Sequence, residues 1–319
     1  MAFRDRQGLR EAARQRLETA AYDPRKLILV YAGVSALAML LVTGANFLLT
    51  EQIAGTGGLG GLGARAALET TMQVIQTAAN LVMPFWNMGY LYCVLKIVRG
   101  QRFDLKDLLA GFRNFAPVLR LTFLYLLQFL MLAFLCFYPT MLVYSITPLS
   151  APLMAIMEPL MQSETMLVLD EATMAAATEA MIPMFILYAV AFLVVAAPRF
   201  YHYRMAFYAL LDDPQSGARM ALRRSTLMMH GRRLDVFKLD ASFWWFYILD
   251  GLTLALCYGD MILGLLGISL PISAEVSYFL FYARYLAAQL GLYVWARNGV
   301  ECTYAAGYDA LCREQAENQ

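Results

Sequence analysis

The stretch HGRRLDVFKLDASFWWFYILD at residues 230–250 passes from a basic segment directly into aromatic side chains. Tryptophan gathers at membrane–water interfaces, and lysine and arginine gather at the cytoplasmic ends of membrane spans. Near an anionic lipid surface each cation contributes about 1 kcal/mol. We therefore interpret this stretch as the cytoplasmic start of a membrane span. The expected lipid-contacting residues, here and on the segment before it, are Arg219, Arg223, Arg224, Arg232, Arg233, Lys238, Trp244 and Trp245.

The composition of the whole chain agrees with a membrane class. Of its 319 residues 60% are hydrophobic and 15% are charged, and the mean hydropathy is +0.54. Soluble domains are about half apolar and about a quarter charged. The net charge of +1 gives no indication of nucleic-acid binding.

Six apolar runs have the length of about 20 residues that a membrane helix needs. They predict an all-α integral membrane protein with six transmembrane helices. Residues 27–311 would form one transmembrane domain, preceded by a basic amphipathic cytoplasmic segment at residues 1–26 and followed by a cytoplasmic tail at residues 312–319. The expected spans are residues 27–49, 71–95, 118–147, 181–210, 243–268 and 276–296.

The distribution of lysine and arginine gives the expected orientation. Of the 25 cations, 23 fall in segments that would share one side of the membrane if the six runs alternate in direction. The positive-inside rule makes that side cytoplasmic. We therefore expect both termini in the cytoplasm.

Amphipathic segments precede the first, third and fifth expected spans, at residues 5–21, 103–115 and 213–231. In the second of these Asp104 is the expected N-cap, and in the third Asp213 caps, followed by proline at the first helical position. Apolar residues at helical spacing predict helices that lie in the headgroup layer. The chain is thus expected to contain three units, each a surface helix followed by a helical hairpin.

Three blocks of sequence resemble a bacterial membrane family known as domain of unknown function 975. They are RGQRFDLKDLLAGF at residues 99–112, ALRRSTLMMHG at residues 221–231 and FKLDASFWW at residues 237–245. The resemblance extends over residues 9–311, with a longer, methionine-rich connection at residues 148–180. It implies a multi-pass protein of the bacterial plasma (inner) membrane and implies no activity.

Amide and hydroxyl side chains form a helical stripe along the second expected span, and Pro84 lies on the same face. Such a face must meet protein or water rather than lipid. It could serve interhelical hydrogen bonds, worth about 0.6 kcal/mol each, or line a hydrated cavity. The stripe contains Gln73, Gln76, Thr77, Asn80 and Asn87.

Three charged residues, Asp250, Asp260 and Arg284, fall within apolar runs, where charge is costly unless paired or hydrated. Counted from the outer ends of the fifth and sixth spans, Asp260 and Arg284 lie at similar depth. We expect them to pair, either as a latch between helices or as part of a gate. The candidate intramembrane site contains Gln73, Gln76, Asn80, Asn87, Asp250, Asp260 and Arg284.

Sequence signatures of enzymes and metal sites are absent. No zinc-protease, hydrolase or phosphate-loop motif occurs, no two of the five cysteines form a C-x-x-C pair, and the chain has two histidines. Met154, Met157 and Met161 have the spacing of one apolar helix face. We therefore expect no enzymatic activity, no cofactor and no metal.

Two functional hypotheses remain. One is a non-enzymatic scaffold that binds a protein partner and the anionic headgroups of membrane lipids, with its cytoplasmic helices as the binding surface. The alternative is a transporter or channel-like protein with a polar cavity lined by the second, fifth and sixth spans. The helix-breaking prolines, the polar stripe and the intramembrane charges favour the alternative. Nucleic acid is not an expected partner.

Overall fold

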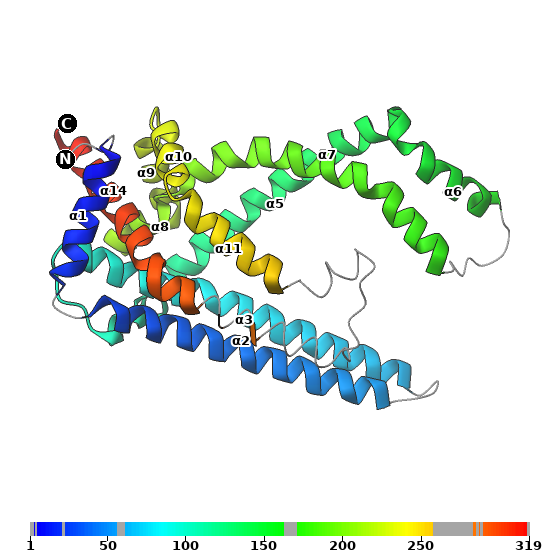
Figure 1. Cartoon of the computed structure of the whole chain (residues 1–319), viewed down its shortest axis with the longest axis horizontal. Helices are drawn as coiled ribbons and strands as arrows, with labels where there is room; N and C mark the ends of the chain where they lie inside the picture. The colour runs from blue at the N-terminus through cyan, green and yellow to red at the C-terminus, as the bar shows by residue number, and fades with distance from the viewer. Residues whose placement is uncertain are drawn as a thin grey trace. The chain divides into compact units, whose positions relative to one another are not determined.

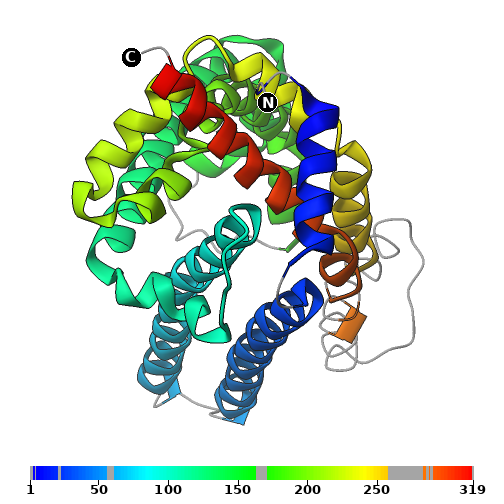
Figure 2. The same cartoon turned by 90° about the vertical axis from the view of Figure 1, so that its left-hand side faces the viewer.

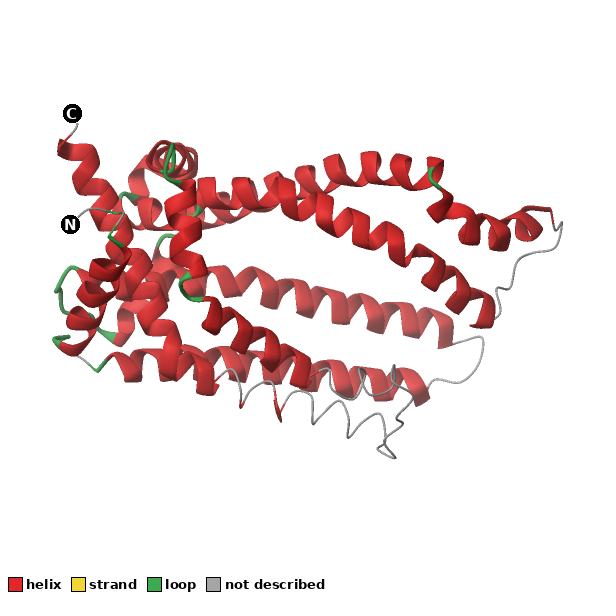
Figure 3. Ribbon diagram, turned by 45° about the horizontal axis from the view of Figure 1, so that its top comes forward, coloured by secondary structure: helices red, strands yellow, loops and turns green. Residues whose placement is uncertain are grey.

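The computed structural model describes residues 3, 5–20, 23–55, 61–162, 171–257, 283–284, 287 and 290–317. Every regular element in these residues is helical, as the sequence predicts (Figure 3). The chain divides into two compact units. Unit 1 contains Met1–Arg120 and Met205–Gln319, and unit 2 contains Leu121–Arg204.

Unit 1 is built around the long antiparallel pair α2 and α3, which lie side by side (Figures 1 and 2). Shorter helices gather at the end of this pair where α2 begins and α3 ends. The helices of unit 1 are α1 (Arg6–Glu18), α2 (Pro24–Gly55), α3 (Gly61–Val98), η1 (Leu105–Leu109), α4 (Ala110–Arg113), α8 (Ala206–Asp212), η3 (Pro214–Ser216), α9 (Gly217–Met228), α10 (Arg233–Ala241), α11 (Trp244–Cys257), η4 (Tyr293–Arg297) and α14 (Asn298–Glu317).

Unit 2 is inserted into the chain of unit 1. It contains most of α5 (Phe115–Ile146), then η2 (Pro148–Ser150), α6 (Ala151–Gln162) and α7 (Glu171–Tyr203). The Tyr144 hydroxyl donates to the Ala180 carbonyl (2.9 Å), which joins α5 to α7. Most other side chains on the two helices are exposed.

Within the described part of the chain, three helical stretches are long and apolar enough to cross a membrane: Ala66–Val98, Phe115–Ile146 and Ala176–Asp212. They coincide with the second, third and fourth expected spans. The first expected span lies within α2, and the fifth begins with α11, one residue later than predicted. Residues 258–282 lie outside the described residues. Every proline in the three stretches is accommodated within a continuous helix, as neighbouring groups in membrane helices permit.

Asp104 and Asp213 are confirmed as the N-caps of η1 and η3, and Asp5, for which no cap was predicted, is the N-cap of α1. The Asp5 carboxylate accepts from the Gly8 amide (2.9 Å), and the Asp213 carboxylate accepts from the Ser216 amide (3.3 Å). The prediction of one uninterrupted helix over residues 213–231 is wrong. Gly217 has φ +78°, outside the right-handed helical region, so the helical path breaks at this residue, where η3 ends and α9 begins.

The amphipathic segment at residues 103–115 also divides, into the 3-10 helix η1 and the short α4, and it crosses α3 at backbone contact. A Cβ atom added to Gly89 of α3 would lie 1.7 Å from the Leu108 carbonyl oxygen. A Cβ added to Gly111 would lie 2.0 Å from the Phe85 carbonyl oxygen. Two glycines therefore permit this crossing. It buries Leu108, whereas Leu105, Leu109, Phe112 and Phe115 are exposed.

The two ends of the chain meet within unit 1, where α1 packs against α14 (Figures 1 and 2). Leu9 and Ala13 are buried on α1. The ring of Phe3 occupies the space above Gly307, where an added Cβ would approach it to 2.9 Å. The Phe3 amide donates to the Glu314 carboxylate (2.8 Å).

Candidate functional site

A polar cluster joins α2, α3 and the π-helical turn η4 in unit 1. Arg297 donates from Nη2 to the Tyr31 hydroxyl (3.3 Å) and to the Asn87 amide oxygen (3.2 Å). The Tyr31 hydroxyl itself donates to Asn87 (3.3 Å). The guanidinium lies over the ring of Tyr31 (4.8 Å) and near that of Tyr90 (5.3 Å), positions that add cation–π attraction. The arginine is thus enclosed by aromatic rings and acceptors.

A second line of hydrogen bonds extends this cluster to the start of α2. The buried Tyr90 hydroxyl donates to the Asn298 amide oxygen (2.8 Å). The Asn298 side-chain amide donates to the Pro24 carbonyl (2.7 Å), an acceptor in the first turn of α2. The Trp86 indole donates to the Tyr31 carbonyl (3.1 Å). Buried polar groups require such partners, so the cluster fixes the mutual register of α2, α3 and α14.

The turn that carries Arg297 has π-helical geometry over Tyr293–Arg297. Such turns interrupt α-helices mostly as isolated bulges and are frequent at functional sites. Glu301 follows on α14 and accepts from the Tyr208 hydroxyl (3.3 Å). Burial raises the pKa of the Cys302 thiol, so this thiol stays protonated at neutral pH and is no nucleophile.

An ion network ties together the ends of α3 and α8 and the middle of α14. The Arg99 guanidinium donates to Asp212 (Nη2 to Oδ2, 3.0 Å) and to Asp309 (Nη2 to Oδ1, 2.8 Å). Tyr308 donates to the same Asp212 oxygen (2.9 Å) and stacks on Tyr208 (5.6 Å between ring centroids). The hydrogen bond to Asp212 is the main reason why the pKa of Arg99 rises, while burial acts against it. This pairing neutralises the charge of Arg99, the first residue of the sequence block at residues 99–112.

A separate ion pair joins α3 to η1. Lys96 Nζ lies 2.8 Å from Asp107 Oδ2, and the Asp104 amide donates to the same oxygen (2.9 Å). Burial pushes the pKa of Asp107 upward, but the hydrogen bonds from Lys96 and Asp104 outweigh it, so the pKa is lowered. The carboxylate is charged at neutral pH.

Part of the segment at residues 230–250 contacts protein rather than lipid. Asp240 is buried and accepts a hydrogen bond from the Tyr304 hydroxyl on α14. Ser242 accepts from Arg10 of α1 (2.7 Å), whose guanidinium lies over the ring of Phe243 (4.4 Å). The block FKLDASFWW therefore anchors the start of α11 to both terminal helices.

The expected lipid-contacting residues differ in their surroundings. Arg219, Arg223 and Lys238 are exposed, and Trp244 is 63% exposed. Arg233 and Trp245 are half-buried. Two of the arginines have carboxylate partners: Arg224 lies 3.6 Å from Asp213, and Arg232 pairs with Glu314.

The structure brings only one residue of the candidate intramembrane site into a polar cluster. Asn87 belongs to the Arg297 cluster, whereas Gln73, Gln76 and Asn80 are exposed on the preceding turns of α3. Asp250 is half-buried on α11, and Arg284 is exposed. Asp260 lies outside the described residues, so its expected pairing with Arg284 stays a prediction. Among the described residues no group of histidine, cysteine and acidic side chains could hold a metal ion.

Sequence reasoning missed the centre of the polar cluster. The sequence predicts no contact among Tyr31, Tyr90 and Arg297. Arg297 is only one of the 23 cations expected on the cytoplasmic side. The available signal was an Arg-Asn pair followed by Glu301 directly after an apolar run. Polar residues at that place need partners from neighbouring helices.

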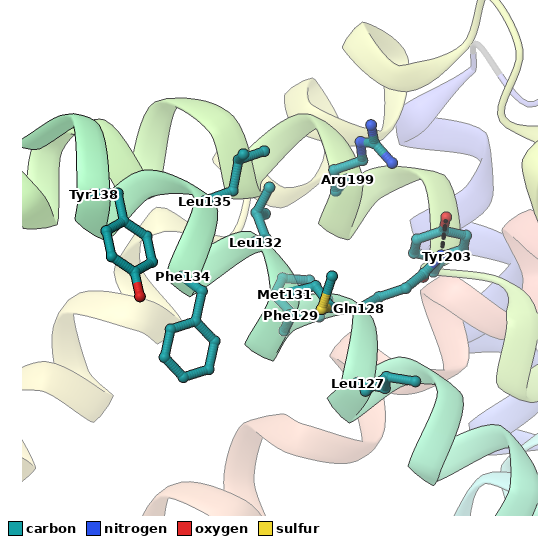
Figure 4. A pocket seen from close by; sticks show the side chains of 10 residues that line it. All are labelled: Leu127, Gln128, Phe129, Met131, Leu132, Phe134, Leu135, Tyr138, Arg199 and Tyr203. Carbon is teal, nitrogen blue, oxygen red and sulfur yellow. Dashed lines mark hydrogen bonds between the residues drawn. The ribbon is translucent and has the colours of Figure 1, made fainter.

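Unit 2 carries a groove of about 540 Å³ between α5 and α7 (Figure 4). Apolar side chains of α5 form most of its lining. Four lining side chains carry polar groups: Gln128, Tyr138, Arg199 and Tyr203. The Gln128 side-chain amide donates to the Tyr203 hydroxyl (2.9 Å).

The chain belongs to a family described as protein of unknown function DUF975, which matches residues 1–289. This confirms the resemblance carried by the three sequence blocks. Neither the curated proteins nor the solved structures contain a significant match to the chain.

Proposed function

We propose that this chain is a multi-pass protein of the bacterial plasma membrane that acts as a non-enzymatic scaffold. Its six spans would hold a helical platform at the cytoplasmic surface. The platform consists of α1, η1, α4, α8, α9, α10 and α14, and the outward face of α9 binds a protein partner and anionic lipid headgroups.

Contact between the two ends of the chain supports an even number of spans. Phe3 packs over Gly307 and bonds to Glu314, so the segments before the first span and after the last lie on one side. The same side receives 23 of the 25 lysines and arginines under the expected threading. The positive-inside rule makes it cytoplasmic.

The observation that carries the scaffold proposal is the outward face of α9. The helix buries Ala218, Ala221 and Met228 and exposes Arg219 and Arg223. Exposed apolar side chains accompany these cations: Met220 and Leu227. A helix face that combines cations with apolar groups fits an acidic, partly apolar partner surface. Because these side chains are exposed, they contribute little to the packing of the platform.

Native mass spectrometry of the protein, released from nanodiscs that were formed directly from its own membrane, tests this proposal. We expect a protein partner at fixed stoichiometry, lost in the double variant R219E/R223E. The matched control R102E/K106E makes the same charge change at other exposed positions and should retain the partner. Loss of the partner in both variants, or absence of any partner from the wild type, would contradict the proposal.

The transporter alternative is favoured by one observation. Gln73, Gln76 and Asn80 are exposed on a helix that is long and apolar enough to cross a membrane. Amides facing lipid would be unfavourable, so these side chains favour a hydrated path. A stoichiometric solute in the same mass spectra, lost in N80L and retained in R219E/R223E, would replace the scaffold proposal with this one.

A further inference from the structure

The groove of unit 2 has an apolar body and a polar end (Figure 4). Leu132, Phe134, Leu135 and Tyr138 of α5 line the body, and most of these side chains are exposed. Arg199, Tyr203 and Gln128 lie toward the other end. A ligand that fits must combine a long apolar part with a polar head.

The groove has the length of one lipid chain. Residues 127–138 of α5 cover about 16 Å at 1.5 Å per residue. One leaflet of hydrocarbon is about 15 Å thick, half of the 30 Å core. An acyl chain that starts at the polar end would therefore extend along α5 to the middle of the bilayer.

The polar end has the chemistry of a phosphate site. Arg199 is exposed, and no ion pair to it occurs among the described residues. The Tyr203 hydroxyl accepts from Gln128, so its own proton can be donated to another acceptor. A guanidinium and a phenol suit phosphate oxygens, and Arg199 supplies the charge that distinguishes anionic from zwitterionic lipid.

The sequence places this end at the membrane surface. The expected span at residues 181–210 is longer than the about 20 residues that a membrane helix needs, and its uninterrupted apolar run ends at Pro198. The next residues, Arg-Phe-Tyr-His-Tyr-Arg, combine cations with interfacial aromatics. Such residues mark the cytoplasmic boundary of a span. The lipid in the groove would therefore belong to the cytoplasmic leaflet.

We propose that the α5–α7 groove is a binding site for one anionic phospholipid of the cytoplasmic leaflet, with its phosphate on Arg199 and Tyr203 and one acyl chain along Leu132 and Leu135. The site rests on the membrane placement in the proposed function but not on the partner surface of α9. Failure of the α9 variants to lose a partner would leave the groove untouched.

Competition between two lipids tests the site. The full chain is delipidated in detergent, mixed with equal amounts of phosphatidylglycerol and phosphatidylcholine of identical acyl chains, and analysed by native mass spectrometry. We expect the first bound lipid to be mainly phosphatidylglycerol. In R199Q the ratio of the two adducts should fall about five-fold, the equivalent of about 1 kcal/mol. The control R102Q removes an exposed cation that neither lines the groove nor belongs to the expected lipid-contacting residues, and it should leave this ratio unchanged.

A second pair of variants tests the apolar body. L132W fills the groove and should lower both adducts in the same proportion, whereas L142W adds the same ring at an exposed position of α5 that does not line the groove. Circular dichroism and gel filtration confirm that each variant is folded before it is compared. Equal binding of the two lipids by the wild type, an unchanged ratio in R199Q, or an equal loss in R102Q would overturn the proposal.

Discussion

The two halves of α3 differ sharply in their surroundings although they form one continuous helix. None of the side chains at residues 66–84 is buried, whereas most of those at residues 85–98 are. Asn80 and Asn87 show the difference best, because they are the same residue type seven positions apart. Asn80 is exposed, and Asn87 accepts hydrogen bonds from Tyr31 and Arg297.

This difference shows that the contacts which determine the fold of unit 1 lie along the buried half of α3. The buried half of α3 contacts α1, η1, α4, α8 and α14, and its polar groups are satisfied by these neighbours. Apolar contact between membrane helices gives little specificity because lipid is equally apolar. The packed end of α3, with its hydrogen bonds and backbone contacts, therefore holds the helices in register.

The largest effect should come from Gly89. G89A places a methyl group 1.7 Å from the Leu108 carbonyl oxygen, where backbone must move. We expect a loss of about 3 kcal/mol or more in stability, at the upper end of overpacking costs. Thermal unfolding in detergent, followed by circular dichroism, measures it. The control is G33A on α2, where nothing lies within 4 Å of the added Cβ. Equal melting temperatures for the two variants would contradict the close crossing.

The two asparagines give the next largest effect. N87L removes the acceptor of Tyr31 and Arg297, and an unsatisfied buried group costs about 1–3 kcal/mol. N80L changes an exposed side chain and should stay within about 0.5 kcal/mol of the wild type. The same unfolding assay compares them. A similar loss in both would mean that the two halves of α3 are equally packed.

A smaller effect should follow from acid. The pKa of Asp107 is lowered in the folded chain from its ordinary value of 3.8, so the pairing with Lys96 contributes fully above that value. The contribution is lost as the pH falls through the lowered pKa. The melting temperature of the wild type should therefore decrease more steeply below about pH 4 than that of D107N. Parallel pH profiles would show that the pair adds nothing.

The sequence predicted much of the packed end of the molecule. The sidedness of charge and the apolar periodicity located the helices, and Asp104 and Asp213 were correctly identified as N-caps. The start of the fifth span was expected at residue 243, and α11 begins at Trp244. These features are local, because each depends on residues within a few positions of one another.

Features that join distant residues could not be predicted in this way. The contacts of Arg297 with Tyr31 and Asn87 extend over 266 and 210 positions of sequence. No periodicity indicates that Gly89 and Gly111 face the backbones of η1 and α3. The division at Gly217 was missed because the cap Asp213 and the following Pro214 were taken as the start of the whole helix, although glycine adopts positive φ without cost.

The central claim is that the packed end of α3 and both ends of the chain form one platform in the cytoplasm. Cysteine labelling with a membrane-impermeant maleimide on intact spheroplasts tests it most directly, in a background whose five native cysteines are replaced by serine. The three variants are E18C on α1, E317C on α14 and E158C on α6, all at exposed positions. The account predicts that E158C is labelled at once, and that E18C and E317C are labelled only after the membrane is opened. Labelling of E18C or E317C on intact spheroplasts would contradict it.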